Sequence, residues 1–596
     1  MNKKLSSSIF CIILSISIIF ISITAYATEE NISVLRNETD TNDTITETLK
    51  QIMQKSSSNE VIPVTVELKD TIELEQIESL AMINANVTLE QISTMEETSM
   101  ELDEFENEYF QKEIKKLYDK ISFERNILLE DHYSNLNNHF LNDANLDKYK
   151  CDSVGIYTPF IRKIELSKDL ITLISKRNDI YSIDYAGDDE GYDFASINDT
   201  YAIIRGNVCI DNGYTGSGIR VGLVESGHPI FSVMGSDSAN ITKTNSGTDK
   251  EHATKTSGII KKMAPSCSIY TRASTGLNNA ISNCEWLIKN KNVNVINISY
   301  GQASGGNYNS YSRDMDQLVK NTRVTIVAAS GNGTSSTQYI NSLGLAANVI
   351  TVGAVKSSGT NQAASGAYTF ENYSLYKENN PVINKPDICA PGCVKIYSYG
   401  ESMGTSFSAP HITGTVVQMM SRNSGLTDKP QTLKAAIMAS ASYNAGTSMS
   451  YVNNTKASDK EGAGVVDAGY CYKVARNGRR THFDASSSST TFSHNVYCDY
   501  INKPFRVACA WEAISNSSNT NITDYDMSIY KDGTLLKTSN AYAHSSSFPN
   551  SNYEIIELSP SIISEYGAGY YQVKITRYGN FNGSGQVRIG LAWEQR

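Results

Sequence analysis

The sequence lacks an excess of basic residues. Its 596 residues contain 52 Lys and Arg against 63 Asp and Glu, so the formal net charge is −11. A nucleic-acid-binding surface needs clustered positive charge, so we expect no nucleic acid partner. The bias of a disordered or collagen-like chain is missing too, because hydrophobic residues make up 40% and charged residues 19%. The length allows roughly four domains of about 150 residues.

Long apolar runs are absent beyond the first residues. No later run approaches the ~18–20 apolar residues of a membrane span, so we expect none once the N-terminal segment is removed. That segment, residues 1–27, has two early lysines, an uncharged apolar run over 9–24 and a small-residue exit at Ala25 and Ala27. This order is typical of a secretory signal peptide, with an uncleaved anchor as the alternative. We therefore expect a secreted, extracellular protein.

Zinc-type cysteine spacing is also absent. The ten cysteines include no two Cys-x2-Cys pairs, which argues against a structural zinc site. Outside the cell, an even number of cysteines permits disulfides, and eight remain once Cys11 and Cys151 leave with segments that we expect to be removed. We expect a bridge between neighbouring strands at Cys498 and Cys509, with buried thiols as the alternative for the others.

The sequence divides into successive segments that differ in composition and in the spacing of their apolar residues. Residues 28–59 are polar and show little apolar periodicity, which predicts a disordered leader. Residues 60–190 carry strand-like runs at 61–68 and 180–185, with helical spacing of apolar residues between 102 and 121. They predict a small α+β domain.

The next segment, residues 196–475, alternates apolar β-type runs with helix-like runs. Near-continuous apolar strands predict a parallel sheet that is covered on both faces, so this is an α/β domain. The predicted strands include residues 219–224, 293–298, 324–329 and 349–352. Residues 480–596 change to short alternating strands with a hairpin turn at Asp532-Gly533, which predicts a β-sandwich.

Four polar residues of the α/β segment lie where strands end or helices begin. Residues 404–410 place Ser406 among small residues at the start of a buried helix, where N–H groups can bind a developing anion. His252 opens a small-residue helical segment, Asn332 follows a strand, and Glu225 closes another. Each alone is more often a cap, a turn or a core residue. Together, at the edge of a sheet where ligands bind, they indicate an active site.

On these residues, the sequence resembles the subtilisin-like serine proteases. The resemblance covers about residues 205–475, and its acidic residue, His, Asn and Ser stand in the family's order at Glu225, His252, Asn332 and Ser406. It implies that Ser406 attacks a peptide bond, that His252 is its general base and that Glu225 holds the imidazole. The Asn332 amide and the Ser406 N–H would bind the oxyanion.

The resemblance also implies a substrate class and the residues that bind it. Ser299, Tyr300 and Gly301 resemble the substrate-edge strand, and Ser330 and Gly331 belong to the same predicted substrate site. The implied substrates are polypeptides.

The flanking segments take roles from the same resemblance. Residues 60–190 would be an inhibitory prodomain, cut between 186 and 200, and residues 480–596 an accessory domain. No cofactor is implied for the chemistry. Calcium sites are common in the family, but no dense carboxylate loop indicates one here.

The sequence departs from the family at the acidic position. The family has Asp where this chain has Glu225, and Lys255 replaces a second His of the family's His motif. Asp237 and Asp249 are alternative acids that do not fit the motif. The departures motivate a second hypothesis, a pseudoprotease that binds peptides or regulates another protease. A third hypothesis is an adhesive protein whose C-terminal β-domain carries the function.

Overall fold

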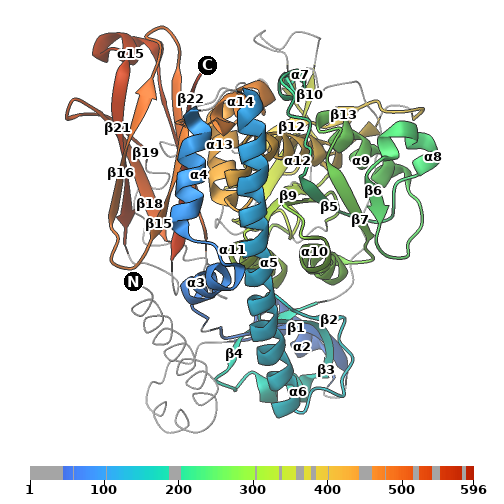
Figure 1. Cartoon of the computed structure of the whole chain (residues 1–596). Coiled ribbons are helices and arrows are strands. Elements are labelled where there is room, and N and C mark those ends of the chain that lie inside the picture. The colour runs from blue at the N-terminus through green and yellow to red at the C-terminus, as the bar shows by residue number, and fades with distance from the viewer. Residues whose placement is uncertain are drawn as a thin grey trace, which may run out of the picture. The chain divides into compact units, whose positions relative to one another are not determined.

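Figure 1 shows the computed structural model of the chain. It describes residues 44–57, 60–70, 72–101, 104–186, 203–301, 305–333, 339–357, 368–376, 384–399, 402–441, 460–476, 478–513, 523–539, 551–579 and 586–596. The predicted signal peptide, residues 28–43 of the predicted leader and nearly all of the predicted cleavage region lie outside the described residues. Among the described residues, no helix is both long enough and apolar enough to cross a membrane.

The N-terminal part of the described chain is built on an antiparallel sheet with the strand order β2-β3-β1-β4. Its most extended helix, α5, has 40 residues. The elements are α2 (Glu47–Lys55), β1 (Val61–Leu68), α3 (Leu74–Ala85), α4 (Leu89–Glu101), α5 (Glu104–Asp143), β2 (Ser153–Val154), β3 (Phe160–Ser167), α6 (Lys168–Ile174) and β4 (Ile180–Tyr185).

The end of the predicted disordered leader differs from the expectation. Residues 47–55 form α2, and Ile45 pairs with Ile183 of β4. The reason is local, because Leu49 and Met53 lie one helical turn apart and both join the core of the small sheet.

The central segment holds an eight-stranded sheet with the order β11-β10-β9-β8-β5-β7-β6, in which β12 also pairs with β10. All of its pairings are parallel except that of β10 with β11. This confirms the predicted α/β fold with a parallel sheet. The strands are β5 (Arg220–Glu225), β6 (Ile241–Lys243), β7 (Ser268–Ala273), β8 (Val295–Ile298), β9 (Thr325–Ala329), β10 (Ile350–Ser357), β11 (Tyr368–Phe370) and β12 (Ile388–Pro391), with a separate pair β13 (Cys393–Val394) and β14 (Ser402–Met403).

Helices cover both faces of this sheet. Alternate residues of β5 join different cores: Leu223 packs with Ile260 of α9 and Ile412 of α12, whereas Val224 packs with Leu287 of α10 and Leu318 of α11. The helices are α7 (Asn207–Asp211), α8 (Phe231–Met234), η1 (Gly235–Ser238), α9 (Glu251–Met263), α10 (Leu277–Lys291), α11 (Ser310–Thr322), α12 (Thr405–Arg422), η2 (Ser424–Leu426), α13 (Pro430–Ser440) and α14 (Ala468–Ala475).

The C-terminal segment has two four-stranded antiparallel sheets, β15-β22-β17-β20 and β16-β21-β18-β19, whose side chains share one core. The β18–β19 turn has positive φ at Asp532 (49°) and Gly533 (84°), as a type I′ hairpin requires. The elements are β15 (Arg480–Ala485), β16 (Thr491–Cys498), β17 (Phe505–Trp511), β18 (Asp524–Lys531), β19 (Thr534–Ser539), β20 (Tyr553–Leu558), α15 (Pro560–Tyr566), β21 (Gly569–Tyr578) and β22 (Val587–Gln595).

The predicted bridge between Cys498 and Cys509 is wrong. Both are free thiols, as are the other seven described cysteines. Cys498 lies in β16 and Cys509 in β17, and these strands belong to different sheets. The two cysteines are therefore not on neighbouring strands, which is the arrangement that the prediction required. Alternating apolar strands do not reveal which strands are neighbours.

Candidate active site

A carboxylate and an imidazole meet at the carboxyl end of the parallel sheet. Glu225 ends β5 and is buried, and its Oε2 lies 2.8 Å from Nδ1 of His252, the second residue of α9. A carboxylate only accepts hydrogen bonds, so Nδ1 carries the proton, and in the neutral ring Nε2 is an acceptor. Glu225 Oε1 is buried and accepts no hydrogen bond from the residues that the structure describes. Although Glu is one methylene longer than Asp, its side chain still places one carboxylate oxygen within hydrogen-bond distance of the imidazole.

Ser406 occupies the first turn of α12, directly after Thr405 at the helix start. The ring of Phe407, the next residue, lies 5.2 Å from the His252 ring, centroid to centroid. This contact places the N-terminus of α12 beside His252. The first N–H groups of a helix have no partner within the helix and carry partial positive charge, which suits an anion next to Ser406.

Asn332 reaches the same helix start from the end of β9. Its Oδ1 accepts from the Thr405 N–H at 2.9 Å and from Thr405 Oγ1 at 3.1 Å. Thr405 Oγ1 in turn accepts from the Gly331 N–H at 3.0 Å. With Oδ1 occupied, the Nδ2 donor of Asn332 is the group left for a ligand. Sequence reasoning missed the part that Thr405 takes in orienting this amide.

A chain of buried polar groups fixes the turn that carries Ser406. Ser299 Oγ donates to the Ser406 carbonyl at 2.8 Å, and Asn297 Nδ2 donates to Ser299 Oγ at 2.9 Å. Thr413 Oγ1 completes the chain by donating to Asn297 Oδ1 at 2.9 Å. Sequence reasoning missed Asn297 and Thr413. The signal was a polar residue inside an apolar strand, which needs a buried partner.

The other predicted substrate residues lie at two neighbouring strand ends. Tyr300 packs against the core shared by α10 and α11, and the backbone of Gly301 makes no hydrogen bond within the described ranges. A Cβ at Gly301 would stand 2.6 Å from the Asn341 side chain. Ser330 and Gly331 instead have internal partners for their backbone N–H and C=O groups. The backbone groups of Gly301 are therefore available to a ligand strand, whereas those of Ser330 and Gly331 are already hydrogen-bonded within the protein.

The alternative acids have other partners. Asp237 accepts from Tyr397 Oη at 3.0 Å, and Asp249 pairs with Lys243 at 2.6 Å. Lys255 is buried and hydrogen-bonds to Ser402 of β14. These contacts leave Glu225 as the carboxylate that meets His252.

His228, three residues after Glu225, is a second buried imidazole. Its Nε2 donates to the Asn245 carbonyl at 2.9 Å, and its Nδ1 accepts from Thr271 Oγ1 at 2.7 Å. Burial lowers its pKa below the usual value. With both nitrogens occupied, this imidazole holds the loop after β5 and has no nitrogen left for a reaction.

Within the described ranges, no group of three or more His, Cys, Asp or Glu is placed to hold a metal ion. A cavity of about 510 Å³ exists elsewhere, and none of the residues discussed above lines it. It lies between α3–α5, the start of α13 and the C-terminal sheet.

Comparisons with known proteins show which family the central segment matches. The subtilase family model matches residues 218–465. Subtilisin from Bacillus pumilus is 30% identical over 238 residues, which cover 35% of this chain and 80% of that protein. The chain belongs to the subtilase family. The part matched to the subtilases contains Glu225, His252, Asn332 and Ser406, and excludes the N-terminal sheet and both C-terminal sheets.

The match to other subtilases extends over only part of each protein. Subtilisin NAT from Bacillus subtilis subsp. natto is 32% identical over 238 residues, 35% of this chain and 58% of that protein. The chain thus spans little more than half the length of this relative. Among solved structures, fervidolysin from Fervidobacterium pennivorans aligns with a TM-score of 0.44 and 12% identity, over 84% of this chain and 69% of that one. Membership rests on the sequence relatives.

Proposed function

We propose that this protein is a secreted serine endopeptidase that cleaves polypeptides through an acyl-enzyme on Ser406. The observation that carries the proposal is the 2.8 Å contact between Glu225 Oε2 and His252 Nδ1, beside the helix start that holds Ser406. Secretion rests on the signal-peptide pattern of residues 1–27.

The chemistry follows from the protonation states. His252 Nε2 takes the Ser406 hydroxyl proton as Oγ attacks the peptide carbonyl, and then gives that proton to the leaving amine as the C–N bond breaks. A water molecule hydrolyses the acyl-enzyme by the same route and restores Ser406. Glu225 keeps the imidazole oriented and stabilises the imidazolium. Asn332 Nδ2 and the Ser406 N–H bind the oxyanion of both tetrahedral intermediates.

The substrate main chain would pair as an added strand along residues 299–301. Gly301 supports this, because its backbone groups lack partners within the described ranges. The N-terminal domain, residues 60–190, would act as an intramolecular inhibitor that is cut in the region 186–200. Its position supports this, because Asp184 Oδ2 accepts from the Ser310 N–H at the start of α11 at 2.8 Å.

The test is hydrolysis of denatured casein by the exported protein. Ser406→Ala should reduce the rate to background, and the N-terminal domain should remain attached in that variant. The control is Ser236→Ala, an exposed serine of η1 that should leave both unchanged. Casein binding without cleavage by the folded wild type would overturn the proposal and favour the pseudoprotease.

A further inference from the structure

The longest helix reaches well beyond the domain to which it belongs. The 40 residues of α5 span about 60 Å at 1.5 Å per residue. Its last turns, at Phe140 and Leu141, join the core of the small sheet, whereas Leu129 and Tyr133 join the core of α10 and α11. Its first half packs instead with α3 and α4 through Ile114. In Figure 1, α5 runs from beside α4 to the small sheet.

The small sheet itself is held to the central segment by buried ion pairs, which we call the sheet anchor. Arg162 of β3 is fully buried and pairs with Glu285 of α10 at 2.8 Å and with Asp314 of α11 at 2.6 Å. Glu67 of β1 pairs with Arg313 of α11 at 2.7 Å. These contacts bind the sheet over α10 and α11.

A second set of contacts lies along the first half of α5, and we call it the far anchor. Gln111 accepts from the Ser424 N–H at 2.8 Å through Oε1, and from Ser424 Oγ at 2.7 Å through its carbonyl. Two turns on, Asp119 pairs with Arg220 at the start of β5 at 2.9 Å. Both partners belong to the central segment, and neither belongs to α10 or α11.

Arg125, just past the middle of α5, extends the far anchor to the last residue of α11, Thr322. The Arg125 side chain is almost fully buried, its Nε pairs with Glu78 of α3 at 2.9 Å, and its Nη1 donates to the Thr322 carbonyl at 2.9 Å. Arg323 pairs with the same Glu78 at 3.0 Å and with Asp428 at 3.5 Å. Glu78 is therefore shared by one arginine from each segment. Separation would remove Arg323 from Glu78 and the Thr322 carbonyl from Arg125, and both groups are largely buried.

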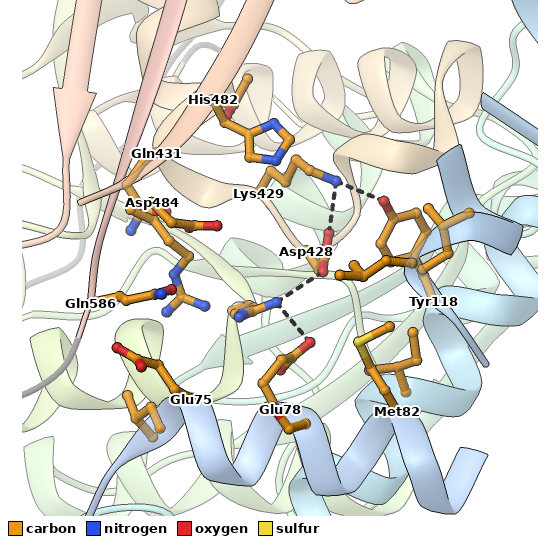
Figure 2. Close-up of a pocket in the computed structure, with 18 of the residues that line it drawn as sticks. Glu75, Glu78, Met82, Tyr118, Asp428, Lys429, Gln431, His482, Asp484 and Gln586 are labelled. Atoms are coloured by element: carbon orange, nitrogen blue, oxygen red, sulfur yellow. Dashed lines mark hydrogen bonds and ion pairs between the residues drawn. The ribbon is translucent and has the colours of Figure 1, made fainter. Parts of the chain in front are cut away.

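The cavity of about 510 Å³ lies at this meeting point. Figure 2 shows Lys429 directed at Asp428 and at the Tyr118 hydroxyl, with Glu78 on the opposite wall and His482 and Asp484 of β15 at the side. Lys429 Nζ donates to Tyr118 Oη at 2.8 Å. The walls come from all three parts of the chain: α3–α5, the start of α13, and the C-terminal sheet.

We propose that the helices of residues 72–143 are a second, independent attachment that keeps the N-terminal domain bound after the chain is cut. The working protein is then a complex of two pieces. The inference rests on the proposed function only for the cut itself. Two linked contact surfaces raise the effective affinity by about 10²–10⁴ over either alone, because one holds the other in place. After the cut, only the end of the N-terminal piece, beyond Ala186, would need to leave the active site.

The test uses the Ser406→Ala chain, so that cleavage and retention do not depend on activity. A recognition site for a sequence-specific protease is introduced within the segment 190–197. The folded protein is then cut at that site. Native mass spectrometry and gel filtration then follow the two pieces, and the dissociation rate is measured with the C-terminal piece immobilised. Arg125→Met is compared with Lys120→Ala, an exposed residue on the same helix.

We expect the pieces to remain together, with Lys120→Ala unchanged and Arg125→Met dissociating on the order of 100-fold faster. If Arg125→Met does not fold, Gln111→Ala replaces it, with dissociation about tenfold faster. Equal rates for the anchor variants and Lys120→Ala, or loss of the N-terminal piece during gel filtration, would overturn the inference. A protein that retains the piece but never cleaves casein would refute only the proposed function.

Discussion

At the residue scale, Glu225 is the carboxylate that contacts His252. Its side chain has one methylene more than Asp, and its Oε2 nevertheless stands 2.8 Å from His252 Nδ1. The backbone at the end of β5 is therefore placed for the longer side chain. Oε1 has no partner among the described residues, so orientation of the carboxylate depends on its contact with His252.

We predict that Glu225→Asp lowers activity and does not improve it. The shorter side chain withdraws the carboxylate by roughly 1 Å, which costs about 10² in kcat/KM. Glu225→Gln keeps the length but loses the charge, and should cost about 10⁴. The measurement is kcat/KM for one peptide substrate. Asp249→Asn, at a carboxylate paired with Lys243, is the control with no expected change. Higher activity in Glu225→Asp would contradict this account.

Lys434 of α13 is an unusual buried amine. It is 2% exposed, and its Nζ lies 2.8 Å from Asp387 and 3.0 Å from Asn552 Oδ1. Asp387 also pairs with Lys385 at 2.6 Å, so two amines share one carboxylate. Burial, with a contribution from Lys385, lowers the pKa of Lys434 from 10.5 to about 7.

This shift predicts a pH dependence of stability. Between about pH 7 and 10.5, Lys434 is neutral in the folded protein but protonated in the unfolded chain. Unfolding takes up a proton there, so the free energy of unfolding rises with pH. Lys434→Met should flatten this rise, as measured by denaturant unfolding of the Ser406→Ala protein at pH 7.5 and 9.5. Lys120→Met, at an exposed lysine, should keep it. An unchanged slope in Lys434→Met would refute the assignment.

At the scale of elements, helix α13 lies directly against one of the two C-terminal sheets, β15-β22-β17-β20. Ala592 of β22 and Ala508 of β17 belong to the same core cluster as Leu433 and Ile437 of α13. A Cβ at Gly590 would stand 2.4 Å from the Thr432 Cα. Small residues therefore let helix and sheet backbones approach closely, which explains their place in the middle of β17 and β22.

Gly590→Ala should thus be costly. The added methyl meets backbone rather than a flexible side chain, so we expect a loss of about 1–3 kcal/mol and a lower Tm. Gly276→Ala is the matched control, because a Cβ at Gly276 would have no atom within 4 Å and the φ there is extended. Thermal unfolding followed by circular dichroism decides, and equal Tm values for the two variants would contradict the close approach.

Elements and sites were predictable to different degrees. Strands β1 and β4 were found at their observed bounds, because β-branched and aromatic runs identify them locally. Ser406, His252, Asn332 and Glu225 were proposed as site residues from motifs. The orienting hydrogen bonds of Thr405 and Asn297 were not, because their partners lie far away in sequence. Strand neighbours, and hence the wrong Cys498–Cys509 bridge, depend on tertiary contacts too.

At the scale of the whole molecule, the C-terminal segment packs directly against the central segment. Arg506 of β17 donates to the Ala463 carbonyl at 2.8 Å, and Asn348 and Ala513 exchange two hydrogen bonds, of 3.0 and 2.8 Å. These contacts accompany the shared apolar core along α13. The segment therefore supports the central sheet from the α13 side.

We predict that a chain ending at residue 477 does not fold stably, because the apolar face of α13 would be exposed to water. The measurement is soluble yield and cooperative unfolding of the truncated Ser406→Ala protein beside the full chain. A truncated protein with an unchanged Tm would contradict the shared core.

The hypothesis of an adhesive protein, in which the C-terminal sheets attach to a surface, is better tested by Tyr497→Ser and Tyr570→Ser than by truncation. Both side chains are exposed.

The most direct test of the central claim is covalent labelling of the exported protein by a serine-directed fluorophosphonate, read by intact mass. We predict one adduct on the wild type and none on Ser406→Ala or His252→Ala. That result requires a hydroxyl activated by the His252–Glu225 pair. An unlabelled, folded wild type would contradict the account and leave a peptide-binding pseudoprotease.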